Sequence, residues 1–409
     1  MVGKLGRCFA VWTVLVACAG CAAGGGGSQD RRGVGVEPPL GVVDEEPPPR
    51  PKGRASEAST SPEIIRYDKE AVRAAGLSES GPDRSRITPA EPGVRIEEAQ
   101  DPRIRAILPD ARCQKPARTD SAGNAPRCTV SLRRASSAMG ADVGGAYAVV
   151  SLIDWSTTSW TVPELALIRA LQPLTTEKDP SVIAVSDARR EVVLTVTGQI
   201  FRYDLESGRQ LNVYDGPGGR IGALAWSADG ARVVVIAGGR AHLLDREMRL
   251  VRTLAAEGEA VAIAVSADGK RAAVGTDIGG VFVFGLDGGP PRAVSRSTQA
   301  VGALAFTSSA LVVAGRDGIL RSLDPGSGRE LGRADAGAAL SRLVVSPDGR
   351  RAATMARDFV LRVHALPSGK VTWKTDWHRA NFAGLAWGAR STIVAVDNDG
   401  ELAAWDVAQ

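Results

Sequence analysis

Residues 224–230 are Leu-Ala-Trp-Ser-Ala-Asp-Gly, a short apolar run that ends in a polar turn. Apolar runs of the same length occur six times between residue 182 and the C-terminus. The residues that end these runs are 41, 39, 41, 39 and 42 positions apart, namely Ser186, Ser227, Ser266, Thr307, Ser346 and Gly388. Runs of four to eight apolar residues bounded by turn residues are typical of buried strands. The sequence is therefore a tandem repeat of strand-containing units.

Each unit holds room for four short strands. The first ends at a turn such as Ser227–Gly230, Ser266–Gly269 or Ser346–Gly349, in which Asp-Gly favours a tight hairpin. A second turn, for example Asp317-Gly318, separates the next two strands. A period of about forty residues with four strands per unit predicts an all-β protein, a β-propeller in which each repeat is one blade.

The number of blades depends on the two ends of the repeat region. Residues 141–181 contain a degenerate repeat unit, with strands expected at 147–152, 159–162 and 166–171. The last unit stops after its third strand, which would leave an exposed sheet edge. Residues 128–133 alternate suitably to supply the missing strand or to begin the first blade. We expect seven blades, with six as the alternative.

These units resemble the WD40-like and YVTN-type repeats of bacterial propellers. Trp405-Asp406 matches the dipeptide that names the WD40 family, and Trp226–Gly230 is similar to the repeats of TolB-type propellers. The resemblance covers roughly residues 140–409 and implies fold more than function. A recurrent Gly-His pair is missing, and only His378 lies near its position. The buried histidine network of WD40 proteins is therefore not expected.

The N-terminus has the features of an export signal. Lys4 and Arg7 precede an apolar core at 9–17, which is too short to span a bilayer. The following Leu15-Val16-Ala17-Cys18 resembles the lipobox of bacterial lipoproteins, which implies lipidation of Cys18, with Cys21 as the alternative. An ordinary secretory signal with incidental cysteines is the other interpretation. We assign residues 1–17 to a lipoprotein signal peptide.

The rest of the chain divides into three parts. Residues 18–105 are rich in Gly and Pro, poor in aromatic residues, and predicted to be a disordered linker. Residues 106–140 form a closing segment, and residues 141–409 the propeller. Cys113 and Cys128 are closely spaced and suit a disulfide in an oxidising compartment, with two free thiols as the alternative.

Few residues offer chemistry. The net charge is +4 and aromatic residues make up 5% of the chain, with no basic block, so nucleic-acid binding is not expected. The chain has three histidines, His242, His364 and His378, which we expect to be strand or loop residues without a partner. No hydrolase elbow, zinc-protease or phosphate-loop motif occurs. We predict no catalytic residue, no metal and no cofactor.

Two weaker patterns remain. Residues 397–401 (Asp-Asn-Asp-Gly-Glu) are the nearest match to a calcium loop, but the distal bidentate acid is missing. Asp277, Asp317 and Asp358 occupy the same place in other repeats, which favours hairpin turns. Residues 368–373 (Ser-Gly-Lys-Val-Thr-Trp) resemble the docking element of quinoprotein propellers, where Ser368 replaces Thr.

The sequence thus predicts a lipid-anchored propeller in a bacterial cell envelope, at the outer membrane, that is not an enzyme. Its expected role is a protein–protein interaction scaffold that recognises protein partners through its rim loops, because a rigid ring positions variable loops well. The alternative is a quinoprotein-like or other small-ligand-binding or enzymatic propeller that uses its central channel. A channel lined by Ala and Val would count against that alternative.

Overall fold

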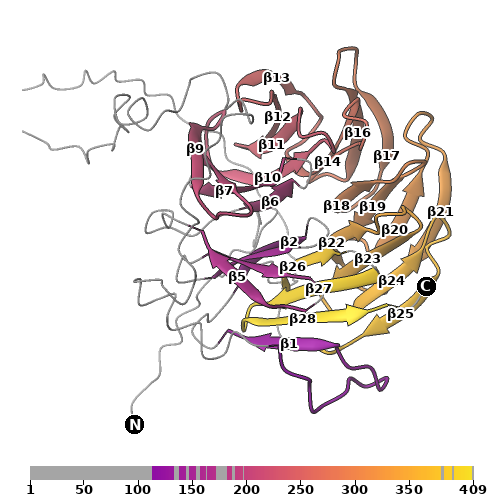
Figure 1. Cartoon of the computed structure of the whole chain (residues 1–409). Coiled ribbons are helices and arrows are strands. Elements are labelled where there is room, and N and C mark those ends of the chain that lie inside the picture. The colour runs from indigo at the N-terminus through magenta and orange to yellow at the C-terminus, as the bar shows by residue number, and fades with distance from the viewer. Residues whose placement is uncertain are drawn as a thin grey trace, which may run out of the picture. The chain divides into compact units, whose positions relative to one another are not determined.

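The protein folds into a ring of seven four-stranded antiparallel blades (Figure 1). The first strand of each blade contacts the first strand of the next, and blade 7 contacts blade 1, so the ring is closed. Within the described part of the chain, no helix has the length and hydropathy needed to cross a bilayer. The computed structural model describes residues 113–132, 138–143, 147–152, 157–162, 164–171, 182–186, 189–196, 198–378, 382–388 and 391–407.

Blades 1–6 are simple meanders, in which strand order follows the chain. Blade 1 consists of β2 (Ala138–Val143), β3 (Tyr147–Leu152), β4 (Thr157–Thr161) and β5 (Leu167–Ala170). Blade 2 consists of β6 (Val182–Ser186), β7 (Glu191–Val196), β8 (Gln199–Asp204) and β9 (Gln210–Asp215). Blade 3 consists of β10 (Ile221–Trp226), β11 (Val233–Ala237), β12 (Arg240–Leu244) and β13 (Leu250–Leu254).

The second half of the ring continues in the same way. Blade 4 consists of β14 (Ala260–Val265), β15 (Arg271–Thr276), β16 (Gly280–Gly285) and β17 (Arg292–Arg296). Blade 5 consists of β18 (Val301–Phe306), β19 (Leu311–Gly315), β20 (Ile319–Leu323) and β21 (Glu330–Asp335). Blade 6 consists of β22 (Leu340–Val345), β23 (Arg351–Ala356), β24 (Leu361–Ala365) and β25 (Val371–Thr375).

Blade 7 joins the two ends of the described chain. Its strands are β26 (Phe382–Trp387), β27 (Thr392–Asp397), β28 (Glu401–Asp406) and β1 (Cys128–Ser131). Strand β1 pairs antiparallel with β28, in a register that runs from Cys128 opposite Ala404 to Ser131 opposite Glu401. Cys128, Val130 and Leu132 are buried, whereas Ser131 is exposed. The expectation that this segment supplies the missing strand is therefore confirmed for residues 128–132, and the alternative that it begins the first blade is wrong. Residue 133 lies outside the described residues.

The repeat pattern located the first strand of six blades correctly, namely β6, β10, β14, β18, β22 and β26. The degenerate repeat unit forms blade 1, so seven blades are confirmed and the six-blade alternative is wrong. Blade 1 begins at Ala138, and the boundary expected at residue 141 lies inside β2.

The blades pack face to face through apolar side chains. The buried residues form seven clusters, and each cluster joins residues from two neighbouring blades. In the cluster between blades 7 and 1, Val130 and Leu132 of the closing segment lie with Trp160 of β4. Because burial of apolar area is the main stabilising term in folding, ring closure is built into the core.

A buried ionic cluster adds a polar element to blade 2. Glu191 lies between Arg189 and Arg202, with 2.7 Å between Glu191 Oε1 and Arg202 Nη2 and 3.2 Å between Glu191 Oε2 and Arg189 Nε. All three side chains are less than a tenth exposed. Arg202 also donates to the Tyr214 hydroxyl, and Arg189 to the carbonyl oxygen of Gly230 in blade 3. Burial, together with the nearby Arg202 charge, lowers the pKa of Arg189.

Candidate functional site

The polar residues of the repeat bond within their own turns. In blade 3, Ser227 Oγ donates to Asp229 Oδ1 and accepts the backbone N–H of Arg232 at 2.9 Å. The same bonds recur from Ser266 to Asp268 and from Ser346 to Asp348. In each case the serine hydroxyl is the main group that holds the pKa of the aspartate below its usual 3.8. These aspartates shape hairpins, as the sequence predicted.

The second turn of the repeat behaves similarly. Asp317 Oδ2 lies 2.6 Å from Arg321 Nη2, and Asp358 forms the equivalent pair with Arg362. Burial by itself would raise the pKa of Asp317. Hydrogen bonds, of which the one from Arg321 has the largest effect, hold this pKa below its usual value. The interpretation of these aspartates as turn residues agrees with their contacts.

The three histidines lie on different elements, and each has a partner. His242 of β12 lies 3.1 Å from Thr253 Oγ1. His364 of β24 bonds Thr354 Oγ1 through Nε2 and the Gly369 carbonyl oxygen through Nδ1, both at 2.9 Å. Burial lowers the pKa of both imidazoles. The expectation that these histidines lack partners is wrong: His242 and His364 face a hydroxyl or carbonyl group, and His378 faces a carboxylate.

His378 belongs to a buried network in blade 7. Its Nδ1 lies 2.8 Å from Asp397 Oδ2, and its ring packs edge-on against Trp405 with 5.3 Å between centroids. All three residues are less than a twentieth exposed. A buried histidine network is therefore present in this blade, contrary to the sequence-based expectation. It joins His378, which follows β25, to Asp397 at the end of β27 and Trp405 of β28.

His378 and Asp397 also form, with Glu401, a group of possible metal ligands among the described residues. One ligand atom each from His378, Asp397 and Glu401 lie within 4.8 Å of one another. However, Asp397 Oδ1 accepts the backbone N–H groups of Asp399 and Glu401, at 3.1 and 2.9 Å, and Oδ2 is bonded to His378. A carboxylate offers about four lone-pair positions, and three are used here. The cluster is built as a hydrogen-bond network, and the calcium interpretation gains nothing from it.

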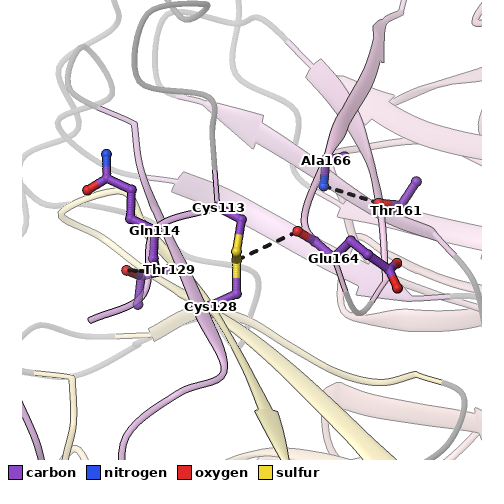
Figure 2. Close-up of a disulfide and its surroundings, with 7 residues drawn as sticks. All are labelled: Cys113, Gln114, Cys128, Thr129, Thr161, Glu164 and Ala166. Carbon is purple, nitrogen blue, oxygen red and sulfur yellow. Dashed lines mark hydrogen bonds between the residues drawn. A yellow bond between two sulfur atoms is a disulfide. The ribbon is translucent and has the colours of Figure 1, made fainter. Parts of the chain in front are cut away.

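The disulfide fixes the closing segment. Cys113 and Cys128 are joined, with 5.4 Å between their Cα atoms (Figure 2). Next to the disulfide, Gln114 and Thr129 exchange two backbone hydrogen bonds of 2.8 and 3.0 Å. The chain before β1 thus runs antiparallel beside it and covers part of its outer edge. We call residues 114–127 the disulfide loop.

The disulfide loop docks on blades 6 and 7 through polar contacts. The Arg118 guanidinium lies 3.9 Å above the Trp377 ring and donates to the Trp377 carbonyl oxygen at 3.2 Å. The backbone N–H of Ser121 donates to Asp376 Oδ1 at 2.9 Å. Asn124 Nδ2 donates to the carbonyl oxygen of Lys374 at 3.1 Å. These contacts join segments about 250 residues apart in the sequence.

A cleft of about 320 Å³ lies between the disulfide loop and the outer strands of blade 6. Its lining combines exposed valine, charged side chains of both signs and a buried hydroxyl, from Asp120, Ser121, Ala122, Val360, Arg362, Val371, Lys374, Thr375 and Asp376. Ligand sites usually combine apolar walls with a few polar groups in this way. The sequence contained no signal for this cleft, because its two walls come from segments far apart in the chain.

The inner strands carry little chemistry. Strands β6, β10, β14, β18 and β26 consist of apolar residues, Gly and one Ser, whereas β2 contributes Asp142 and β22 contributes Ser341 and Arg342. Arg342 is half-buried, and Nη2 donates to the Ala383 carbonyl oxygen at 3.0 Å. Burial lowers the pKa of Arg342 to about 10. One aspartate in blade 1 and one arginine in blade 6, two blades that are not adjacent, do not by themselves make a catalytic arrangement.

The element that resembles a quinoprotein dock forms an inter-blade contact. Trp373 of β25 meets Trp405 of blade 7 edge-on, with 6.5 Å between ring centroids. Trp226 and Trp387 end the first strands β10 and β26, and both join inter-blade clusters. These tryptophans pack one blade against the next.

The candidate lipidation residues Cys18 and Cys21, the signal peptide and the predicted linker lie outside the described residues.

Comparison with known proteins identifies the fold. No family model matches the chain, and no curated protein matches its sequence. A chain of the mitotic checkpoint complex has a TM-score of 0.61 at 18% identity, covering 69% of this chain and 95% of that one. The Swd1 propeller of Myceliophteria thermophila gives 0.58 at 16% identity, covering 68% and 100%. The designed protein Ika8 gives 0.54 at 17%, covering 67% and 97%. At these identities the likeness concerns the fold alone, which is a WD40-like β-propeller.

Proposed function

We propose that this chain is an exported, lipid-anchored β-propeller that acts as a protein–protein interaction scaffold in a bacterial envelope, at the outer membrane. The observation that carries the scaffold role is the distribution of polar groups. Turn aspartates bond within their own hairpins, and the inner strands are almost wholly apolar. The solvent-exposed side chains of varied charge and polarity lie in the rim loops and in the disulfide loop with its cleft. Loops on a rigid frame are the usual carriers of recognition.

Two further points support the proposal. One of the similar chains belongs to a multi-protein assembly, the mitotic checkpoint complex. The envelope location rests on the sequence alone, on the basic residues Lys4 and Arg7, the apolar core and the lipobox-like run that ends at Cys18. A channel-based quinoprotein or enzyme is the weaker candidate, because Trp373 and Trp405 pack against each other and the first strands of the blades carry two charged residues, Asp142 and Arg342.

Site-specific photo-crosslinking in cells tests the scaffold role. A photoreactive residue at Ala122 in the disulfide loop or at Arg357 in the turn between β23 and β24 should give a discrete adduct with another protein. Val251 of outer strand β13 is the control, because it is also solvent-facing, at 50% exposed, but lies in a strand and not in a loop. Adducts at Val251 alone, or none at any position, would contradict recognition through the rim.

The lipid anchor needs a separate measurement. Intact mass of the membrane-extracted protein should show an acyl-bearing N-terminal cysteine. Cys18→Ser should abolish it, whereas Cys21→Ser should leave it in place. An unmodified mass in both the wild type and the two variants would rule out the lipoprotein assignment, without affecting the scaffold test.

A further inference from the structure

The two sulfur atoms of the disulfide have different surroundings. Cys113 is exposed, whereas Cys128 is 1% exposed and belongs to the cluster of Val130 and Leu132. Thiol–disulfide exchange requires an incoming thiolate to reach one sulfur, so access decides which sulfur is attacked. An external thiolate can therefore reach the Cys113 sulfur, and the Cys128 sulfur is the leaving group.

The leaving sulfur has an acceptor ready beside it. Cys128 Sγ lies 3.6 Å from the carbonyl oxygen of Glu164, in the turn between β4 and β5 of blade 1 (Figure 2). A disulfide sulfur carries no hydrogen and makes no hydrogen bond there. A Cys128 thiol would carry one, and thiols are weak donors. The reduced form of Cys128 is thus accommodated without moving β1.

The disulfide loop and β1 are attached to the ring by different means. Strand β1 is held by its ladder to β28 and by buried Val130, neither of which needs the disulfide. The two ends of the loop are held by backbone hydrogen bonds, between Gln114 and Thr129 and from Arg127 to Ala404. The rest of the loop is held by the partly exposed ion pair of Arg118 with Glu401, by the Arg118–Trp377 contact and by single hydrogen bonds. Exposed ion pairs contribute little. The covalent constraint is the strongest restraint on the loop.

We propose that Cys113–Cys128 is a redox latch, whose reduction by a protein dithiol releases the disulfide loop from blades 6 and 7 while β1 keeps the ring closed. Release removes Asp120, Ser121 and Ala122 from the wall of the cleft. The latch would switch the cleft between a walled and an open form. It does not depend on the identity of the scaffold's partner.

The exchange balances in two steps. One thiolate of the dithiol attacks Cys113 Sγ, forms a mixed disulfide and expels the Cys128 thiolate, which takes up a proton. The second thiolate of the dithiol then attacks the dithiol's other sulfur, which is the one bonded to Cys113 in the mixed disulfide. This step expels the Cys113 thiolate, which is protonated in turn. The protein gains two electrons and two protons, and the dithiol is oxidised to a disulfide.

Hydrogen exchange of the full chain with and without dithiothreitol tests the latch, with thiols counted by maleimide trapping under native conditions. Closing a loop across 15 residues shifts the opening equilibrium by about a hundredfold in the chain-entropy model. We therefore expect two more native thiols with dithiothreitol than without it, and amide exchange about a hundredfold faster in residues 114–127. Exchange in β1 and β28 should not change.

Three results would overturn the latch. Thiols that appear only in denaturant would show that the bond is inaccessible. Loss of protection in β1 and β28 together with the loop would show that the disulfide stabilises the whole of blade 7 and not the loop alone. Unchanged exchange in the loop would show that its non-covalent contacts suffice.

Two variants separate the covalent from the non-covalent restraint. Cys113→Ser leaves the Cys128 thiol in place and should exchange like the reduced wild type without any reductant. Arg118→Ala is the matched control, because it removes a docking contact but keeps the disulfide, and its loop should still respond to dithiothreitol. Should Cys113→Ser fail to fold, the titration of the wild type decides alone.

Discussion

The buried ionic cluster of blade 2 allows a stringent test of the packing, through substitution of Glu191 by Gln. The carboxylate of Glu191 lies between two guanidinium groups, and the side chains of Glu191 and Arg202 are 8% and 9% exposed. Glutamine keeps the shape but leaves both positive charges buried without that counter-charge. Removing one partner of a buried ion pair costs roughly 3–5 kcal/mol. Since glutamine retains an acceptor oxygen, we expect about 3 kcal/mol.

A matched control lies in the same blade. Glu206 pairs with Arg190, but the two side chains are 66% and 43% exposed. Because exposed pairs contribute about 0–1 kcal/mol, Glu206→Gln should cost less than about 1 kcal/mol. The two variants make the same chemical change and differ in burial.

Urea and thermal unfolding followed by tryptophan fluorescence provide the measurement. At about 2 °C per kcal/mol for a protein of this size, Glu191→Gln should lower Tm by about 6 °C, and Glu206→Gln by about 2 °C or less. High salt should reduce the effect of Glu206→Gln and leave that of Glu191→Gln nearly unchanged, since buried pairs are screened little. Equal shifts for the two variants would refute the reasoning.

Three other predictions concern closure, turns and blade contacts. Val130→Ala in β1 should cost about 2 kcal/mol in urea unfolding, because Val130 is fully buried between blades 7 and 1; an unchanged midpoint would show that β1 is not part of the core. The pKa of Asp348 is depressed in the folded protein, so the stability that its carboxylate contributes is present above the unfolded pKa near 3.8 and is lost as pH falls below that value. Ser346→Ala should therefore flatten the fall in Tm between pH 5 and 3, measured by calorimetry. An unaltered pH profile would count against the turn hydrogen bond. Gly332→Ala should cost about 1–3 kcal/mol, because an added Cβ would lie 1.9 Å from the Pro367 carbonyl oxygen, whereas Gly222→Ala meets nothing within 4 Å; similar Tm values for the two variants would contradict the close approach of blades 5 and 6.

The fold was predictable because its signal is local and repeated. The apolar run at 224–226, its Ser-Asp-Gly turn and the spacing of about forty residues each reflect contacts within one blade. Even the closing strand could be inferred, since a three-stranded last unit requires a fourth strand and residues 128–133 alternate. Strand ends were less certain in blade 1, where β2 begins at Ala138.

The candidate site was not predictable, because it depends on long-range packing. Arg118 and Trp377 are 259 residues apart, and nothing in the pattern near either residue indicates that they touch. The His378–Asp397 bond spans 19 residues, but no pattern near either residue indicates that the imidazole meets this carboxylate. In both cases the residue types were visible, whereas their proximity follows from ring closure.

Strand β1 in register with β28 is the basis of both the closed ring and the latch, and an engineered cross-link tests it most directly. Ser131 lies opposite Glu401 in the ladder, so Ser131→Cys with Glu401→Cys should form a disulfide in the native protein, detected by mass spectrometry of non-reduced peptides. Ser131→Cys with Asp406→Cys is the out-of-register control. Linkage of 131 to 401 and not to 406 is the predicted result. Absence of the 131–401 link, or equal yields for both pairs, would contradict closure of the ring by β1.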